Sequence, residues 1–334
     1  MYSCANGRLV FPPTSTGSSA AALPTVQGNN PPLCSAAATT LHLSDPPYED
    51  YFYSDCNVDA QVVITSPLPD SNLTIIGPRL VVAWPAGNSG VCAFFAPQNG
   101  INGTLGIKLM NITSGGTLQP VYKAASGSKG YPSVGVSGII NFNSSARLTV
   151  PILGSVRTIR DFTEGPSLLR SQIQDAIKSS SVGTGAVLSR VWLDNITTTE
   201  LGFIPITSSG ASSVKVNNQT LEFGVGEYLF YTDFNYPQLT QLNASAVLNP
   251  MAQGLIAQKP DQTISLSFLS YSEKLLAGAW RFLTYFGRDS MIAALLLQPV
   301  LSQGPGGAME AVIGAVLERI NKTDGSVAHE ETLG

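Results

Sequence analysis

The chain of 334 residues is long enough for one large domain or two ordinary ones. Only 12% of the residues are charged, about half the usual share, whereas 43% are hydrophobic, which allows sizeable cores. A net charge of -4 without a basic run argues against nucleic acid or an anionic membrane as a partner. No apolar stretch approaches the ~20 residues that a membrane span needs.

Eight Asn-x-Ser/Thr sequons point to an N-glycosylated protein. One such tripeptide is common by chance, but eight in a charge-poor chain fit a secreted glycoprotein better than a cytosolic protein. We therefore expect glycans on the sequon asparagines. These are Asn72, Asn102, Asn111, Asn143, Asn195, Asn218, Asn243 and Asn321.

The cysteines also favour an extracellular location. Cys4, Cys34, Cys56 and Cys92 all lie in the first 92 residues, too far apart for a zinc ribbon. We expect one or two disulfides, and three pairings are possible. The first eight residues contain no apolar segment of a signal peptide, so we expect that the sequence is not the complete precursor.

The first 47 residues are rich in Ser, Ala, Pro, Thr and Gly. Such a composition buries little, which predicts a loose leader held by cysteines. The alternative is an irregular loop on a sheet edge.

Residues 48–232 predict an antiparallel β-sandwich. Short runs rich in β-branched and aromatic residues alternate with Gly, Pro, Asn and Ser, which is typical of many short strands. One interruption, residues 166–177, predicts a helix because apolar residues recur four apart. The predicted strands cover residues 61–65, 73–76, 80–84, 91–95, 106–110, 138–142, 147–150, 186–193 and 227–232.

Residues 233–263 predict a linker, and residues 264–334 predict helices. The three helices span about 265–278, 288–298 and 308–320. The middle one contains the apolar run Met291–Leu297, which we expect to be a core helix. The last one is the clearest amphipathic segment. Its apolar stripe consists of Met309, Val312, Ile313, Val316, Leu317 and Ile320.

Arg288 and Asp289 at the start of the middle helix are candidates for sugar binding. A guanidinium donates hydrogen bonds and a carboxylate accepts them, which suits vicinal hydroxyls. Trp280, Tyr285 and Phe286 could present flat apolar faces to a sugar ring, although aromatic residues before a helix are more often core. The alternative for Asp289, or for Ser290 after it, is a simple N-cap.

His329, Glu330 and Glu331 form a second ionisable group thirty residues later. At a cavity rim, one of the two carboxyls could have a raised pKa and act as a general acid. The alternative is a solvated acidic loop. The chain contains no phosphate-binding P-loop and no Gly-x-Ser-x-Gly elbow. With only His42 and His329 present, we expect no His-rich metal site and no cofactor.

Residues 285–297 resemble the Phe-Gly-Arg-Asp-Ser/Thr signature that opens the catalytic domain of glycogen-debranching-type amylo-α-1,6-glucosidases. More broadly they resemble the six-hairpin, (α/α)6-barrel glycosidases, including glucoamylases, which often place a β-sandwich before the barrel. Residues 325–331 resemble an element of a debranching-like subgroup. The resemblance covers about residues 262–334.

The resemblance implies a function for these residues. Arg288 and Asp289 would bind the sugar at the non-reducing end, and Glu330 and Glu331 would be candidates for the acid of an inverting hydrolysis. It also implies a fold: a β-sandwich followed by the start of an all-α (α/α)6 toroid. After Gln262 there is room for three of twelve helices, so we expect a fragment with little activity alone and with exposed apolar faces.

The function expected from the sequence is therefore that of a secreted glycoside hydrolase acting on an oligo- or polysaccharide. The alternative is a non-catalytic glycan-binding or cell-surface β-sandwich module. The expected partner is a carbohydrate substrate.

Overall fold

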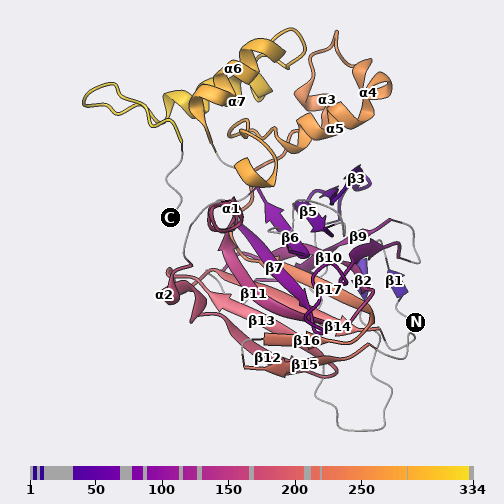
Figure 1. Ribbon diagram of the computed structural model, residues 1–334. Helices are drawn as coiled ribbons and strands as arrows, with labels where there is room; N and C mark the ends of the chain where they lie inside the picture. The colour runs from indigo at the N-terminus through magenta and orange to yellow at the C-terminus, as the bar shows by residue number, and fades with distance from the viewer. Residues whose placement is uncertain are drawn as a thin grey trace.

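Two antiparallel β-sheets pack face to face, and most of the helices lie beyond one of them (Figure 1). The computed structural model describes residues 3–5, 8–10, 33–67, 77–85, 89–112, 116–125, 130–164, 169–206, 212–218, 220–283 and 285–330. A separate two-stranded sheet pairs β1 (Ser3–Ala5) with β2 (Arg8–Val10).

The larger sheet has eight strands, all paired antiparallel to their neighbours. In spatial order they are β15 (Val214–Asn217), β16 (Thr220–Phe223), β11 (Ala146–Ser155), β7 (Ser89–Pro97), β6 (Arg79–Trp84), β5 (Asp59–Thr65), β4 (Tyr48–Ser54) and β3 (Thr39–Asp45).

The second sheet has seven strands. Six follow one another in space, and the seventh, β9 (Leu118–Lys123), also pairs with β10. The six are β12 (Lys178–Val182), β13 (Gly185–Val191), β14 (Thr198–Pro205), β17 (Gly226–Phe234), β10 (Ser133–Phe142) and β8 (Ile107–Met110).

The main core lies between the two sheets. Alternate residues of each strand point into it, since side chains alternate across a strand, and aromatic rings occupy its centre. Phe95 packs edge to face against Phe142 and Phe203, with ring centroids 5.0 and 6.2 Å apart. At the other end, the rings of Trp84 and Phe234 are 4.4 Å apart.

The eight-stranded sheet is buried on its outer face as well. Every residue of β5 and β6 is buried, although an antiparallel sheet commonly leaves one face in water. The cover consists of α1 and of residues 239–283, whose apolar side chains form a second core with this face. In that core Phe52 of β4 meets Phe268 edge to face at 4.9 Å, and Trp280 packs near Arg79 of β6.

The helices are short. Seven α-helices and one 3-10 turn occur in the described residues. They are α1 (Val156–Glu164), α2 (Ser171–Gln174), α3 (Ala244–Val247), α4 (Leu255–Gln258), α5 (Pro260–Phe268), η2 (Trp280–Phe282), α6 (Gly287–Leu297) and α7 (Ala308–Leu317).

The predicted β-sandwich is confirmed, but its first strand begins earlier in the sequence than predicted. Strand β3 starts at Thr39, inside the predicted leader, and its pairing with β4 makes it part of the sheet. The segment 73–76, predicted as a strand, lies outside the described residues. Residues 166–177 were predicted as one helix; residues 166–168 lie outside the described residues, and in the described part, 169–177, only α2 is helical.

The predicted start of an (α/α)6 toroid is wrong. The chain is mostly β-sheet, and the helices after β17 do not form successive hairpins around an axis. Residues 233–263, predicted as a linker, contain α3, α4 and the start of α5. The predicted helix 265–278 ends at Phe268, because the chain then turns to cover the sheet with Tyr271, Leu276 and Trp280.

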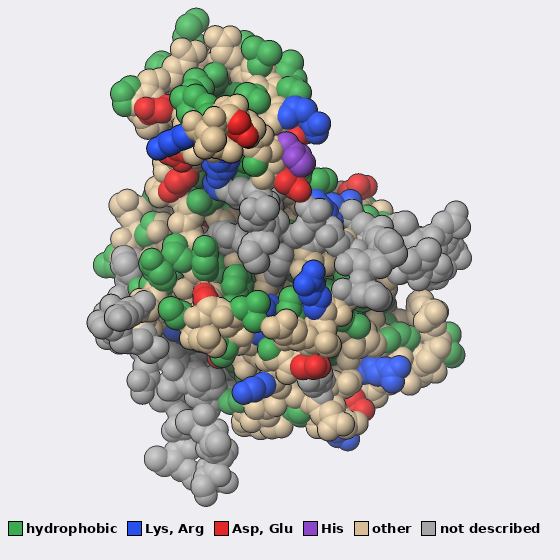
Figure 2. Space-filling model, turned by 90° about the vertical axis from the view of Figure 1, so that its left-hand side faces the viewer, with side chains coloured by type: hydrophobic (Ala, Val, Ile, Leu, Met, Phe, Trp, Pro, Cys, Tyr) green, Lys and Arg blue, Asp and Glu red, His purple; other side chains and the backbone are tan. Residues whose placement is uncertain are grey.

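The prediction of a core helix at Met291–Leu297 is also wrong. In α6 only Gly287, Ser290 and Ala294 are buried, whereas Leu295 and Leu296 are 73% and 74% exposed. The helix packs on one side only, against α7 and the α3–α4 region. Figure 2 shows hydrophobic side chains at the surface of this helical end of the molecule.

The described side chains include one disulfide, between Cys34 and Cys56. Cys92 is a buried free thiol in β7, and burial raises its pKa to about 12. Among the sequon asparagines, Asn72 lies outside the described residues, and the other seven are exposed. None of the described helices is both long and apolar enough to cross a membrane.

A buried carboxyl lies where β5 meets the covering segment. Asp59 is 4% exposed, and its backbone N–H donates to Gln238 Oε1 at 3.1 Å. Its Oδ1 accepts no hydrogen bond from the described residues. Burial raises the pKa of Asp59 to about 7; a hydrogen bond from Ser54 lowers it, and the nearby Asp55 charge raises it further.

This carboxyl predicts a stability that falls as pH rises. Because the folded pKa lies above the unfolded value near 3.9, the native state binds more protons between these two values. We expect the free energy of unfolding to decrease by a few kcal/mol between roughly pH 4 and pH 7. The Asp59→Asn variant should lose most of this pH dependence. Urea unfolding at several pH values measures it. Asp261→Asn, at an exposed position, is the control; equal pH slopes for Asp59→Asn and wild type would contradict the prediction.

Candidate functional site

The structure brings the two predicted halves of the motif site together. Phe286 forms an isolated antiparallel bridge with Glu330, and the Gly287 N–H donates to the His329 carbonyl at 2.9 Å. Arg288, Asp289, His329 and Glu330 therefore share one corner of the helical end, although forty residues separate the two pairs in the sequence. We call these four residues the corner cluster. Glu331 lies outside the described residues.

The corner cluster is open to solvent. The side chains of Arg288 and Asp289 are 72% and 46% exposed and pair with each other at 3.3 Å, so the ion pair contributes little to stability. Asp289 lies in the first turn of α6 but does not cap it, since the N-cap residue is Phe286. Ser290 is no cap either: its hydroxyl donates to the Leu275 carbonyl at 2.8 Å. The N-cap alternative is therefore wrong.

Tyr285 and Gly287 hold the start of α6 in place. Tyr285 is fully buried, and the Arg319 guanidinium stacks 4.1 Å from its ring centroid. A Cβ added at Gly287 would lie 2.5 Å from the Tyr285 hydroxyl oxygen, which only a residue without a side chain avoids. Tyr285, predicted to contact a sugar, instead packs inside the helical end.

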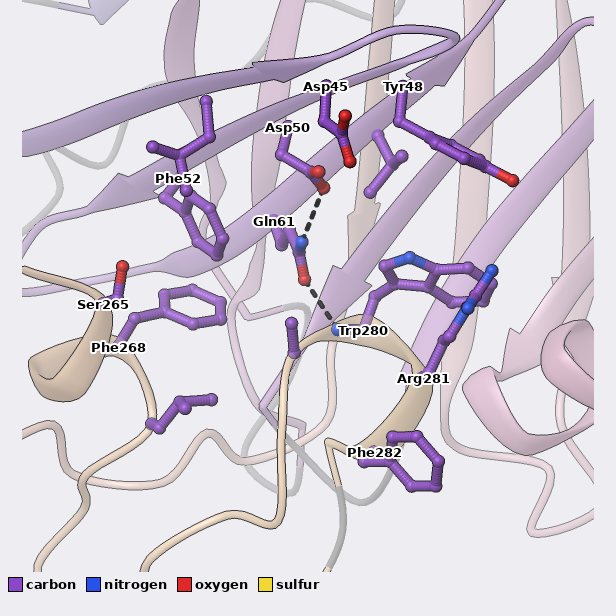
Figure 3. A pocket seen from close by; sticks show the side chains of 14 residues that line it. Asp45, Tyr48, Asp50, Phe52, Gln61, Ser265, Phe268, Trp280, Arg281 and Phe282 are labelled. Carbon is purple, nitrogen blue, oxygen red and sulfur yellow. Dashed lines mark hydrogen bonds between the residues drawn. The ribbon is translucent and has the colours of Figure 1, made fainter. Parts of the chain in front are cut away.

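A cleft lies between the outer face of the eight-stranded sheet and the covering segment (Figure 3). Its volume is about 530 Å³, within the range of ligand pockets. β3, β4 and β5 form one wall, and α5 and the η2 region form the other. The lining residues are Leu43, Asp45, Tyr48, Asp50, Phe52, Gln61, Val63, Ser265, Phe268, Leu269, Ala279, Trp280, Arg281 and Phe282.

The two-residue period of the strands places these side chains on one face. Tyr48, Asp50 and Phe52 alternate along β4, and the intervening Tyr51 and Tyr53 point into the core between the sheets. Antiparallel pairing sets Leu43 of β3 and Val63 of β5 beside Asp50. The β3–β4 hairpin, which turns at Pro46-Pro47, thus presents a polar and aromatic stripe next to the covering segment.

A hydrogen-bonded relay joins the two walls of the cleft. The Gln61 amide Nε2 donates to Asp50 Oδ1 at 2.9 Å, and Gln61 Oε1 accepts from the Trp280 backbone N–H at 2.6 Å, as Figure 3 shows. Gln61 is almost fully buried, so both ends of its amide find partners inside the protein. The relay connects the Asp50 carboxyl to the backbone of the opposite wall at Trp280.

Charges of both signs line the cleft. Burial raises the pKa of Asp50, and the carboxylates of Asp45 and Glu49 raise it further; the hydrogen bond from Gln61 and the Arg281 charge act in the opposite direction. The Arg281 guanidinium lies 5.2 Å from the Trp280 ring centroid. Such a site can accept and donate hydrogen bonds beside flat aromatic faces.

Aromatic rings link the cleft to the corner cluster. Phe282 lines the cleft, and its ring centroid lies 5.9 Å from that of Phe286. The Phe286 ring in turn lies 6.2 Å from that of His329. The cleft and the corner cluster are therefore neighbouring parts of one surface rather than unrelated sites.

Trp280 is the one predicted site residue that lines the cleft. Sequence reasoning missed Tyr48, Asp50, Gln61 and Arg281. The alternation Tyr48-x-Asp50-x-Phe52 was a usable signal, because it places two aromatic rings and a carboxyl on one strand face. Nothing in the sequence indicated that residues 265–282 would cover that face.

No model of a known protein family matches the chain, and a search of curated proteins finds no match either. The geometry of the cleft and of the corner cluster is therefore the basis for assigning a function.

Gly287→Ala is expected to destabilise the helical end by about 1–3 kcal/mol, because the new methyl group would overlap the Tyr285 hydroxyl. Gly314→Ala in α7 is the matched control: nothing lies within 4 Å of its added Cβ, and alanine favours the helix by up to about 1 kcal/mol. Thermal unfolding of the two variants measures the difference. Equal shifts in Tm would show that the Tyr285–Gly287 contact does not hold the start of α6.

Proposed function

We propose that this chain is an extracellular protein that binds an oligo- or polysaccharide in the cleft. The observation that carries the proposal is the relay Asp50–Gln61–Trp280, which ties a carboxyl of one wall to the backbone of the other wall in a cleft also lined by aromatic rings. A sugar ring has apolar C–H faces and a rim of hydroxyls. It can pack on Tyr48 or Phe282, donate hydrogen bonds to Asp50 and accept them from Arg281.

The extracellular location is supported by the cysteines and the sequons. The Cys34–Cys56 disulfide persists most readily in an oxidising compartment. Seven sequon asparagines lie exposed at the surface, where a glycan would not disturb the core.

Glycan binding is expected to depend on Tyr48 and Asp50. Tyr48→Ala should weaken binding about tenfold, ~1.4 kcal/mol, by removing a ring from the wall. Because burial raises the pKa of Asp50, its charged form is lost at a higher pH than for an ordinary aspartate, so binding should weaken on acidification. Asp50→Asn should bind more weakly at neutral pH and lose this pH dependence.

A glycan array followed by calorimetry measures these effects. Tyr131→Ala is the control, since Tyr131 is an exposed tyrosine that does not line the cleft. If Tyr48→Ala and Tyr131→Ala bind every glycan equally well, the cleft is not the binding site.

Glycoside hydrolysis at the corner cluster is a second candidate function. The bridge between Phe286 and Glu330 supports it, because it brings the backbone of Glu330 next to the segment that carries the Arg288–Asp289 pair, at the end of the aromatic path from the cleft. A glycan held in the cleft could then extend toward these carboxyls. Hydrolysis with inversion needs two carboxyl groups, one as acid and one as base.

This candidate predicts unequal roles for the two adjacent glutamates. Of Glu330→Gln and Glu331→Gln, one should lower kcat on α-glycosides about 10²-fold or more, because only one can be the acid. Glu318→Gln, on the exposed end of α7, is the control. Equal and small effects, or no turnover by the wild-type chain on a panel of α-glycosides, would reject hydrolysis by this chain and leave glycan binding as its function.

A further inference from the structure

The hairpin between β13 and β14 has a tightly ordered loop of six residues, 192–197. The Trp192 N–H donates to the Thr197 carbonyl at 2.8 Å and closes the loop, and the Asn195 N–H donates to the Trp192 carbonyl at 3.0 Å inside it. The Asp194 carboxylate accepts from the backbone N–H groups of Ile196 and Thr197, both at 2.9 Å. These hydrogen bonds hold the loop, and the glycosylation sequon within it, in one conformation.

Asn195 stands at the exposed tip of this loop. Its φ of 57° is left-handed, a conformation that asparagine tolerates better than most residues. Its backbone bond to Trp192 spans a β-turn, in which the first and last Cα atoms lie within about 7 Å. The backbone of Asn195 is therefore close to that of Trp192, within reach of a sugar attached to Asn195.

Trp192 offers a prepared aromatic surface. Its ring lies nearly parallel to that of Tyr236, with an angle of 19° and centroids 6.1 Å apart. The indole Nε1–H donates to Thr199 Oγ1 at 2.8 Å, which fixes the ring orientation. Trp192 is half-buried and Tyr236 is 38% exposed, so the pair remains accessible from solvent.

Asn195 belongs to the sequon Asn195-Ile196-Thr197. Of the eight sequons in the chain, it is the one with an aromatic residue three positions earlier. We propose that Asn195 carries an N-linked glycan whose first sugar packs on the Trp192–Tyr236 ring pair and stabilises the hairpin. The inference rests on the extracellular location proposed above, but not on the cleft.

The modification joins Asn195 Nδ2 to the anomeric carbon of the first sugar. The donor is an oligosaccharide linked to a lipid diphosphate. The bond from the anomeric carbon to the diphosphate oxygen breaks, the lipid diphosphate leaves with the electron pair, and the proton lost by Nδ2 passes to a base of the transferring enzyme. In the folded chain the Thr197 hydroxyl donates to Asp194 Oδ2 at 2.5 Å, so we expect the transfer to precede folding of the loop. Folding then brings the apolar face of the sugar onto the two rings and removes water from both.

The test uses the full chain from a eukaryotic secretory host. Glycopeptide mass spectrometry is expected to show Asn195 occupied. Trimming every glycan to its first sugar should leave Tm unchanged, whereas Asn195→Gln should lower it by about 2 °C more than the control Asn218→Gln. Asn218 is also an exposed sequon asparagine at a hairpin tip with a left-handed φ, of 54°, but Lys215 stands three residues before it.

Trp192→Ala should abolish the extra effect of Asn195→Gln. If Trp192→Ala does not fold, the rate of enzymatic glycan release from the native wild-type protein decides, and it should be slower at Asn195 than at Asn218. An unoccupied Asn195 among occupied sequons, equal Tm shifts for the two glutamine variants, or equal release rates would overturn the inference. If all eight sequons are unoccupied, the proposed extracellular location is rejected as well. The glycan-binding assay on the cleft is a separate measurement and is not affected by this result.

Discussion

The packing of residues 239–283 on the outer face of the eight-stranded sheet is the constraint on which the rest of the molecule depends. It buries β5 and β6 on both faces and forms the second core around Phe268, Tyr271 and Trp280. Apolar burial supplies the main attraction, and the bond from the Trp280 N–H to Gln61 fixes the position of the covering segment. Without this cover, the sheet would expose a broad apolar face to water.

The cleft exists because the covering segment does not cover the whole outer face of the sheet. At the edge strand β3 and its neighbour β4 the cover is incomplete, so Tyr48 and Asp50 line a cavity. The same segment continues through Phe282 and Phe286 to the start of α6, where the bridge to Glu330 forms the corner cluster. One stretch of chain thus closes the second core, walls the cleft and positions the exposed charged residues.

Several buried polar groups lie at this junction. Asp59 and Asp50 both have raised pKa values because burial disfavours their charged forms. Gln61 and Gln238 provide amide groups that bond to the covering segment or to the strand backbone. We therefore expect the association of the sheet with its cover to depend on pH.

The sequence by itself determined the local elements: most strands of the sandwich, because β-branched and aromatic runs are bounded by turn residues, and the positions of α6 and α7. It also showed Arg288–Asp289 and His329–Glu330 as two ionisable pairs, but not that the two segments lie side by side.

Only the tertiary structure decided which faces are buried. The apolar stripe predicted for α7 includes Ile313 and Leu317, which are exposed, while Ala308, Ala311 and Ala315 are buried, because small residues allow close packing against neighbouring segments. Likewise, the alternation in β4 establishes that Tyr48 and Asp50 share a face, but the cleft exists only because a segment more than 200 residues away packs opposite them. Periodicity is a local property, whereas the partner of a face depends on contacts between distant parts of the chain.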